Sequence, residues 1–298
     1  MNKNILKKTA LKMENAIVAR SFAKINLFLE ITGKNSKNYH LIDSLMAFID
    51  IFDIISVEKS SKLELEITGE QNLKFLGNKG DNILIKTTNL FAKKYNFTPN
   101  INIKLEKNIP IAAGLGGGSA NAATLIEILI KLYDLKISKE ELEKIALEIG
   151  SDVPFCLHKK IALVSGVGEI IRSISIDKKN LYLLIINPKV SIDTGKIFQN
   201  YQPSEENIQK EQKLDLISMI KCRKNHLEQV AIQFCPKIVD ILENLRLQRN
   251  IISAKLSGSG ATCFGVFVKK SDLDLAFDNL KSIFPEFYIK KTKLLYSV

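Results

Sequence analysis

The sequence is poor in the residues that build metal sites, disulfide frameworks and aromatic platforms. Its 298 residues include no tryptophan and only three histidines, none at the spacing of a transition-metal site. The four cysteines, Cys156, Cys222, Cys235 and Cys263, lie far apart and match neither a zinc pattern nor a disulfide framework. We therefore expect no protein-built metal site, free thiols in a reducing compartment, and a cytoplasmic location.

Long apolar runs are also missing. No stretch approaches the roughly 18 apolar residues that a membrane-spanning helix requires, so we expect no membrane partner. Residues 1–14 carry lysines but have neither the apolar centre nor the cleavage site of a signal peptide. Met13 stands just before the first periodic segment, so Met1 and Met13 are both candidate starts.

The charge is basic, but its composition argues against a nucleic-acid partner. The net charge is +11, yet only five of the 43 basic residues are arginine, and the lysines are scattered among acidic residues. Base readout favours the planar guanidinium of arginine. Single-strand binding combines a basic groove with aromatic residues, and the sequence shows no basic stripe with interleaved aromatics. The charge therefore indicates a solvated lysine-rich surface; the alternative is a long-range field that attracts anionic substrates.

The hydrophobic periodicity predicts an α+β chain of two domains, with boundaries at 15–170 and 171–298. Residues 17–32 alternate as a half-buried strand. Lys24 and Asn26 share one face with Phe28 and Glu30, and the opposite face carries Ile25, Leu27, Leu29 and Ile31. Strands are also expected at 63–68, 101–105, 181–186, 254–256, 264–268 and 287–296, and beyond Pro154 generally. Helices are expected at 82–95, after Ser119, at 138–149, within 214–247 and at 271–284, and a polar surface excursion is expected at 200–213.

The most informative segment is the glycine-rich stretch from Pro110 to Ala120. It lies between a predicted strand and an amphipathic helix, and it contains Gly114-Leu115-Gly116-Gly117-Gly118-Ser119. Glycine allows close backbone approach, and a helix N-terminus favours anions, so the segment predicts phosphate binding. No Gly-Lys-Ser/Thr ends it, which excludes the P-loop pattern. The alternative is a flexible turn without a ligand.

Two other loops have possible chemical roles. Asp152 lies in Gly150-Ser151-Asp152-Val153-Pro154, where a short acid could take a proton from a substrate hydroxyl. Its alternative is a residue that shapes an Asx turn. The small-residue loop Ser257–Thr262 joins two predicted strands, and it is either a simple hairpin connection or a second wall for the phosphate site.

These segments together resemble the superfamily of galactose, homoserine, mevalonate and phosphomevalonate kinases. The matching motifs occur in the same order: Ser21–Asn26, Gly114–Ser119 and Ser257–Thr262. The resemblance implies a small-molecule kinase with an N-terminal domain like the second domain of ribosomal protein S5. It also implies a ferredoxin-like C-terminal domain, and ATP with Mg²⁺ as cofactors.

Three further segments resemble one branch of this superfamily, whose alcohol substrate carries a cytidine diphosphate group in non-mevalonate isoprenoid synthesis. They are Asn38–Ser44, Gly150–Phe155 and Ser191–Thr194 with Phe198 downstream. The resemblance then implies ATP-dependent phosphorylation of the 2-hydroxyl group of a methylerythritol, by a monomer or a weak homodimer.

The resemblance also assigns roles to matching residues. Asp152 would be the catalytic base, and Lys24 beside it would neutralise the transferring phosphoryl group. The ATP phosphates would lie on the loop, with further contacts from two residues on the adenine side. The substrate would contact Asn26 and Thr194. His40 would recognise its pyrimidine ring, while Tyr39 and Phe198 would stack on the two faces of that ring. The nucleotide residues are Asn82, Lys107, Pro110, Ala113, Gly114, Leu115, Gly116, Gly117, Gly118, Ser119 and Ala120, and the substrate residues are Asn26, Tyr39, His40, Thr194 and Phe198.

The sequence leaves three alternatives. A sibling kinase acting on mevalonate or homoserine has no need for a pyrimidine site made of the Tyr39-His40 pair and Phe198. For Tyr39 and Phe198 the alternative role is ordinary core packing. An RNA-binding module would explain the basic charge, but it leaves Lys24, Asp152 and the glycine-rich loop without a role. A catalytically inactive relative has no reason to keep Lys24 and Asp152.

Overall fold

The computed structural model describes residues 16–69, 81–203 and 215–298. The strands are β1 (Ile17–Lys34), β2 (His40–Lys59), β3 (Glu64–Thr68), β4 (Ile101–Glu106), β5 (Ala162–Gly166), β6 (Ile170–Ser173), β7 (Tyr182–Asn187), β8 (Ser253–Leu256), β9 (Cys263–Phe267) and β10 (Tyr288–Leu295). The helices are α2 (Ile83–Tyr95), α3 (Gly117–Leu132), α4 (Lys139–Ile149), α5 (Val153–His158), α6 (Thr194–Asn200), α7 (Leu216–Cys222), α8 (Glu228–Phe234), α9 (Lys237–Arg246) and α10 (Lys270–Ile283).

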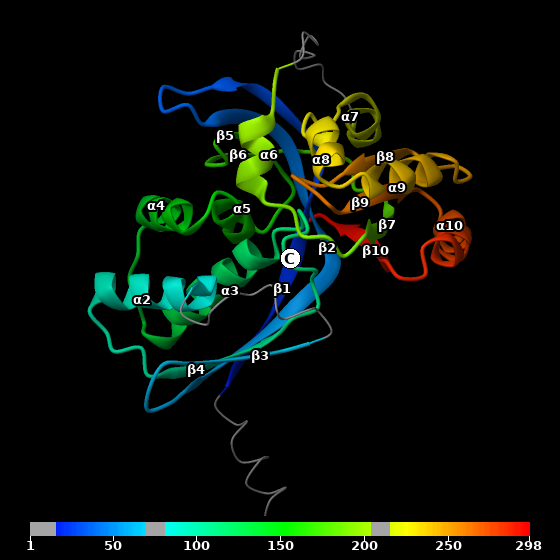
Figure 1. The fold of residues 1–298 in the computed structure, drawn as a ribbon. Coiled ribbons are helices and arrows are strands. Elements are labelled where there is room, and N and C mark those ends of the chain that lie inside the picture. The colour runs from blue at the N-terminus through cyan, green and yellow to red at the C-terminus, as the bar shows by residue number, and fades with distance from the viewer. Residues whose placement is uncertain (1–15, 70–80, 204–214) are drawn as a thin grey trace, which may run out of the picture.

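A long antiparallel hairpin of β1 and β2 runs through the whole molecule (Figure 1). The pairing extends from Ile17 opposite Val57 to Lys34 opposite His40, beside the turn. Every side chain of β1 from Ala23 to Ile31 is buried, because protein covers both faces of the hairpin there. Lys24 and Asn26 are therefore held in the interior.

The alternation of β1 is interrupted by a shift of strand register between Asn26 and Phe28. Ile25 and Leu27 belong to one hydrophobic cluster, whereas Leu29 and Ile31 belong to the other. The expectation that these four apolar residues share one face is therefore wrong. The physical reason is the extra residue at the irregularity, which reverses the side-chain alternation beyond it.

One continuous sheet connects the two halves of the molecule. Its order is β3-β4-β2-β10-β7-β9-β8, β1 and β5 also pair with β2, and β6 pairs with β5. The strands β10-β7-β9-β8 are antiparallel throughout. If these four strands are numbered 1 to 4 along the chain, their order in the sheet is 4-1-3-2, which is the strand order of a ferredoxin-like domain.

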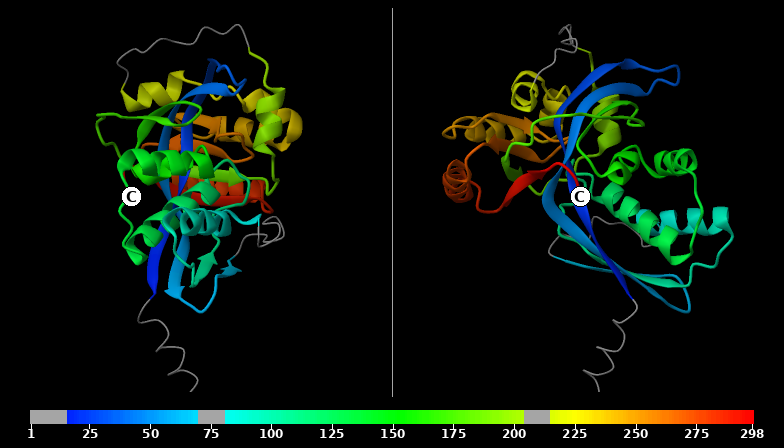
Figure 2. Two further views of the ribbon diagram at one scale, coloured as in Figure 1. Left: turned by 90° about the vertical axis from the view of Figure 1, so that its left-hand side faces the viewer. Right: turned by 180° about the vertical axis from the view of Figure 1, so that it is seen from behind.

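The helices α2 to α5 cover one face of the sheet part formed by β1, β2 and β4, whereas α8, α9 and α10 lie against the C-terminal strands (Figures 1 and 2). Helix α3 contacts β1, α2 and α5. The inner face of α3 carries mostly small and branched apolar side chains between Ala120 and Leu129, and these are buried against the neighbouring elements. This packing fixes the N-terminus of α3 beside β1.

Most of the predicted elements are present within two or three residues. The strands expected beyond Pro154 are wrong in two places. Helix α5 occupies Val153–His158 and accepts Pro154 in its first turn, and α6 occupies Thr194–Asn200 after the N-cap Asp193. Much of the polar excursion at 200–213 lies outside the described residues. The division between residues 170 and 171 stays a prediction; β6 pairs with β5 up to Ser173, and β7 begins the second group of strands.

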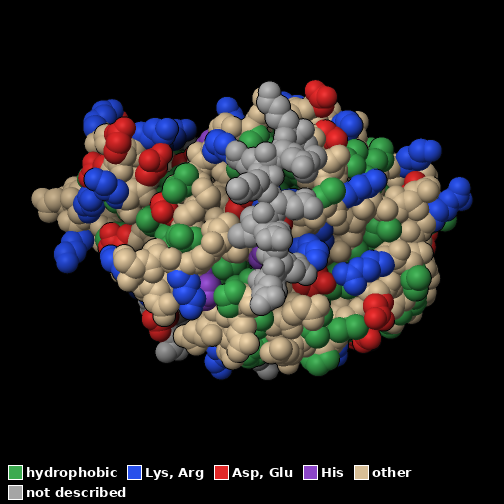
Figure 3. All heavy atoms as spheres, turned by 90° about the horizontal axis from the view of Figure 1, so that it is seen from above, with side chains coloured by type: hydrophobic (Ala, Val, Ile, Leu, Met, Phe, Trp, Pro, Cys, Tyr) green, Lys and Arg blue, Asp and Glu red, His purple; other side chains and the backbone are tan. Residues whose placement is uncertain are grey.

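On the face shown in Figure 3, lysine and arginine side chains lie interspersed with acidic ones. Within 16–69, 81–203 and 215–298, no helix combines the length and the apolar character needed to cross a membrane.

Candidate active site

The glycine-rich loop leads directly into α3, and two of its glycines adopt left-handed backbone angles. The φ angles of Gly114 and Gly116 are 75° and 62°. A Cβ atom on Gly114 would lie 2.1 Å from the carbonyl oxygen of Ser257, and one on Gly116 would lie 2.5 Å from Cγ of Lys24. Gly116 is the N-cap of α3 and supplies no side-chain acceptor. The first amides of α3 are therefore available to an anion, as the sequence predicts.

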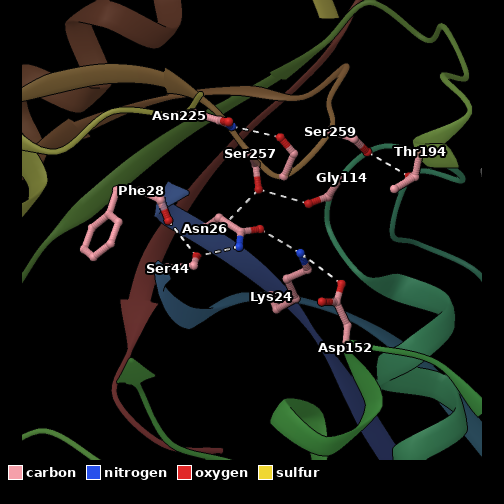
Figure 4. A network of polar contacts seen from close by, with 11 residues as sticks. Lys24, Asn26, Phe28, Ser44, Gly114, Asp152, Thr194, Asn225, Ser257 and Ser259 are labelled. Carbon is pink, nitrogen blue, oxygen red and sulfur yellow. Dashed lines mark hydrogen bonds and ion pairs between the residues drawn. The ribbon is translucent and has the colours of Figure 1, made fainter. Parts of the chain in front are cut away.

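Lys24 and Asp152 meet beside this loop (Figure 4). The Nζ atom of Lys24 lies 3.0 Å from Oδ2 of Asp152, and their side chains are 5% and 26% exposed. The backbone amide of Lys24 donates to the carbonyl oxygen of Leu115 at 3.0 Å. This bond ties β1 to the loop, so the ammonium group stays beside the loop while the carboxylate remains partly accessible.

A chain of hydrogen bonds orients Lys24 from behind (Figure 4). The Ser44 hydroxyl donates to the carbonyl oxygen of Phe28 at 2.6 Å, so it must accept from Nδ2 of Asn26, 2.9 Å away. That choice turns Oδ1 of Asn26 toward Nζ of Lys24, at 2.7 Å. The shared face of Lys24 and Asn26 is therefore confirmed, and Ser44 determines which end of the amide faces the ammonium.

The loop between β8 and β9 closes the site from the other half of the chain. The Ser257 hydroxyl donates to the carbonyl oxygen of Gly114 at 3.0 Å and accepts from the backbone amide of Asn26 at 3.3 Å. Asn225 donates to the carbonyl oxygens of Leu256 and Gly258, both at 2.8 Å. Ser257 thus packs the second small-residue loop against the first, and the interpretation of residues 257–262 as a second wall is preferred over a simple hairpin connection.

A cleft of about 1060 Å³ runs along these loops and collects the site residues predicted from the sequence. Of these, the cleft is lined by Lys24, Asn26, Tyr39, His40, Asn82, Lys107, Pro110, Ala113, Gly114, Gly116, Gly117, Gly118, Ser119, Asp152, Thr194 and Phe198. Leu115 and Ala120 do not line it: their side chains are 1% and 3% exposed and belong to the hydrophobic clusters. They support the loop from inside.

At the nucleotide end, Lys107 and Asn82 are both buried in the wall of the cleft. Nζ of Lys107 lies 2.6 Å from Oδ2 of Asp53. Burial lowers the pKa of Lys107, and the Asp53 carboxylate opposes that shift. Asn82 is the N-cap of α2, and its side chain accepts from the backbone amide of Leu84 at 2.9 Å.

At the opposite end of the cleft, aromatic rings gather around His40 at the start of β2. The centroid of its ring lies 5.7 Å from that of Phe198 on α6 and 5.6 Å from that of Tyr201. Tyr39 is 63% exposed, and the Thr194 hydroxyl shares a 2.8 Å hydrogen bond with the Ser259 hydroxyl. Burial, and then the positive charge of Lys34, lower the pKa of His40.

The Nε2 atom of His40 is buried and has no hydrogen-bond partner among the described residues. A buried polar atom that lines a cleft and lacks a partner is a candidate contact for a ligand.

Three important polar residues were missing from the predicted site. Ser44 and Ser259 lie in segments that were recognised as motifs, but their hydroxyl partners are distant in sequence. Asp53 gave a weaker signal: it is an acid within the apolar stretch of β2, and it is fully buried. Only the fold shows that its carboxylate accepts from the backbone amides of Asn108 and Ile109, at 2.7 and 2.8 Å.

Comparison with known proteins assigns this geometry to a family. The family model described as "GHMP kinases N terminal domain" matches residues 82–160, and the model described as "GHMP kinases C terminal" matches residues 206–286. The 4-diphosphocytidyl-2-C-methyl-D-erythritol kinase of Thermoanaerobacter pseudethanolicus is 36% identical over 284 residues, which cover 93% of this chain and 96% of that protein. The chain belongs to the 4-diphosphocytidyl-2-C-methyl-D-erythritol kinase family. The protein of the same name from Ehrlichia ruminantium is 37% identical over 280 residues, covering 92% of this chain and 97% of that protein.

Membership of this family, within the GHMP kinases, makes the chain a small-molecule kinase with ATP as phosphoryl donor. The same fold is found in solved structures. A 4-(cytidine 5'-diphospho)-2C-methyl-D-erythritol kinase gives a TM-score of 0.76 at 23% identity, covering 93% of this chain and 99% of that chain. A homoserine kinase from Cytophaga hutchinsonii gives 0.69 at 17% identity, covering 96% of each. The predicted two-domain α+β kinase fold is therefore confirmed.

Proposed function

We propose that this chain transfers the γ-phosphoryl group of ATP to the 2-hydroxyl group of 4-diphosphocytidyl-2-C-methyl-D-erythritol, in non-mevalonate isoprenoid synthesis. The observation that carries the proposal is a single cleft with a charged pair suited to phosphoryl transfer at one end and a group of rings suited to base binding at the other. The Lys24–Asp152 pair stands beside the glycine-rich loop, and His40 with Phe198 stands at the far end. The names of the most similar relatives point to the same reaction.

In this reaction the Asp152 carboxylate takes the proton of the 2-hydroxyl group, and the resulting oxygen attacks the γ-phosphorus. The bond from that phosphorus to the oxygen bridging to the β-phosphate breaks, and ADP leaves with the electron pair. The Lys24 ammonium, held by Oδ1 of Asn26 at 2.7 Å, offsets the charge on the phosphoryl oxygens. The amides at the start of α3 and the Ser119 hydroxyl hold the triphosphate.

The cytidine end of the substrate would lie against His40, Tyr39 and Phe198. The unpartnered Nε2 atom of His40 supports an edge hydrogen bond to the pyrimidine. A lowered pKa keeps the His40 ring neutral near pH 7, so its nitrogens can serve as one donor and one acceptor. Stacking on Tyr39 and Phe198 would add to this recognition. Asn26 and Thr194 would contact the methylerythritol part and the diphosphate.

A Mg²⁺ ion fits the cleft if phosphate oxygens and water supply most of its ligands. Asp152 is the only carboxylate among the described lining residues, and the Ser119 hydroxyl is a second oxygen donor there. No group of three or more metal-binding side chains occurs in the part of the chain that the structure describes. When bound, the ion would neutralise charge on the phosphates.

Three expectations from the sequence stay predictions beside this proposal. They are the monomeric or weakly dimeric state, the cytoplasmic location and the lack of a nucleic-acid partner. An RNA-binding module would show RNA affinity that falls steeply with salt.

The experiment that tests the proposal measures ADP release with a panel of alcohols. The panel contains 4-diphosphocytidyl-2-C-methyl-D-erythritol, the methylerythritol phosphate that lacks the cytidine group, mevalonate and homoserine. We expect turnover with the cytidine diphosphate compound and at most background with the others. Equal turnover with mevalonate or homoserine would refute the substrate assignment while keeping the kinase assignment.

A further inference from the structure

Asn121, on the second turn of α3, has a buried side-chain oxygen that no described residue satisfies. The residue is 2% exposed and lines the cleft, and its Oδ1 atom has no hydrogen-bond partner within the described ranges. It lies one helical turn beyond Gly117, whose backbone belongs to the glycine-rich loop. A buried acceptor without a partner costs free energy, so its presence in a cleft points to a ligand that donates a hydrogen bond.

The orientation of this amide is fixed by Asp53. Oδ2 of Asp53 accepts from Nδ2 of Asn121 at 2.9 Å, and from Nζ of Lys107 at 2.6 Å. An ionised carboxylate only accepts hydrogen bonds, so the nitrogen end of the Asn121 amide must face Asp53, and the oxygen end must face away. The fully buried Asp53 therefore holds an acceptor, Oδ1 of Asn121, beside a donor, the Lys107 ammonium.

The walls around this pair suit a flat base. Ile83, Leu84 and Leu105 line the same cleft, and a Cβ atom on Gly118 would lie 3.9 Å from the side chain of Ile83. A Cβ atom on Gly117 would lie 3.0 Å from Nζ of Lys107. The donor and acceptor thus stand at the junction of the glycine-rich loop with an apolar surface. A nucleotide whose phosphates occupy the loop would bring its base to this surface.

ATP offers few donors to an acceptor placed there. Its phosphates and ring nitrogens only accept, which leaves the 6-amino group and the ribose hydroxyls. Adenine presents its 6-amino donor next to a ring-nitrogen acceptor, whereas guanine presents an oxygen acceptor in place of the amino group. The Asn121–Lys107 pair is the complement of the adenine arrangement, and it leaves two acceptors facing each other for guanine.

We propose that Asn121 is a specificity-determining residue, which accepts a hydrogen bond from the 6-amino group of adenine while Lys107 donates to the adjacent ring nitrogen. Asp53 is the positioning residue that orients both. The inference rests on the proposed use of ATP at this cleft. The proposed site then has two parts: the glycine-rich loop binds the phosphates, and the buried amide of Asn121 recognises the base.

The test compares ATP with purine riboside triphosphate, which lacks only the 6-amino group, in the unsubstituted chain and in Asn121→Ser. Serine keeps a small polar side chain at this buried position, but it is too short to place an acceptor where Oδ1 stood. We expect the unsubstituted chain to prefer ATP in kcat/KM by about tenfold or more, the value of one buried hydrogen bond. The serine variant should bring this ratio to within about threefold of unity, mostly through KM.

The ratio separates direct recognition from loss of structure, because both nucleotides are assayed on the same protein. If the serine variant fails to fold, Asn121→Ala assayed at lower temperature takes its place. A 2'-deoxy-ATP arm tests the ribose: a variant that loses the preference for ATP over 2'-deoxy-ATP, and keeps it over purine riboside triphosphate, overturns the proposal. An unchanged ratio for both analogues overturns it as well.

Asn102→Ser is the matched control. Asn102 is also a buried asparagine, its Nδ2 donates to the Glu66 carboxylate at 2.9 Å, and its Oδ1 lacks a described partner, but it is not among the residues that line the cleft. We expect this variant to keep the nucleotide ratio, and a loss equal to that of the Asn121 variant would overturn the proposal. Failure of the proposed function would instead appear as absent transfer from ATP in the unsubstituted chain.

Discussion

Replacement of Asp152 by asparagine tests the centre of the proposed chemistry. The amide is nearly the same size as the carboxylate, but it cannot take the proton of the substrate hydroxyl. Lys24 keeps its 2.7 Å hydrogen bond to Oδ1 of Asn26 and its backbone bond to Leu115, so the ammonium group stays in place. The substitution therefore removes the base and leaves its surroundings unchanged.

The magnitudes follow from this geometry. Loss of a general base lowers kcat by about 10²–10⁴, which corresponds to roughly 3–5 kcal/mol in activation free energy. The Lys24 side chain is only 5% exposed, so neutralising its partner should also lower the stability of the fold, which is why unfolding is measured beside activity. The KM for ATP should change by less than about threefold, because the loop that binds the phosphates does not involve this side chain.

The assay couples ADP release to a spectroscopic readout, with thermal unfolding followed in parallel. Asp134→Asn is the matched control, because its carboxylate also pairs with a lysine, Lys136 at 2.7 Å, but is 86% exposed. We expect the control to keep full turnover. If Asp152→Asn retained kcat within about tenfold of the unsubstituted chain, Asp152 would not be the base and the proposed reaction step would be refuted.

Three other substitutions probe the remaining parts of the molecule. Phe198→Ala should raise the KM for the cytidine substrate by about 5- to 150-fold through lost stacking, with the KM for ATP unchanged. Gly116→Ala places a Cβ atom 2.5 Å from Cγ of Lys24 at a φ of 62°, and the displaced ammonium should lower kcat about 100-fold. Burial lowers the pKa of Lys255 from 10.5 to about 8. Between those two pH values Lys255 is protonated in the unfolded chain but not in the folded one. The free energy of unfolding should therefore rise with pH there, by up to about 3 kcal/mol, and Lys255→Met should abolish this rise.

Each of these has an outcome that contradicts it. Equal weakening of ATP and cytidine-substrate binding by Phe198→Ala, measured by calorimetry, would remove that ring from the pyrimidine site. Normal kcat in Gly116→Ala would mean that Lys24 can move without loss of catalysis. For Lys255, the Tm difference between variant and unsubstituted chain should shift in favour of the unsubstituted chain between pH 7 and pH 9.5. A constant difference would show that the lysine does not titrate in this window.

Much of the fold follows from local sequence patterns. Ser138 with Glu141 three residues later is the capping-box pattern, which predicts the start of α4. In the structure the Glu141 backbone amide donates to the Ser138 hydroxyl at 3.2 Å. Glycines 114 and 116 predict a loop with positive φ angles before a helix, which is present. These features were readable because their causes lie within a few residues of each other.

The pattern failed where a single residue or distant packing decided the outcome. The irregularity at Leu27 has no local signal, yet it moves Leu29 and Ile31 into the other hydrophobic cluster. The residues from Val153 to His158 form a helix although apolar, proline-containing stretches of this length also occur as strands. In both places the tertiary environment was stronger than the local preference.

The sequence by itself determined which chemical groups are present: a glycine-rich loop before a helix, a lysine and an asparagine two residues apart on one strand, and an aspartate next to a proline. Only the tertiary structure decided which groups meet. It brings Asp152 within 3.0 Å of Lys24, places Ser257 on Gly114, and buries Asp53 beneath Lys107 and Asn121. The physical reason is that the spacing along one strand or helix fixes only local neighbours, whereas contacts between distant segments depend on how the sheet and helices pack.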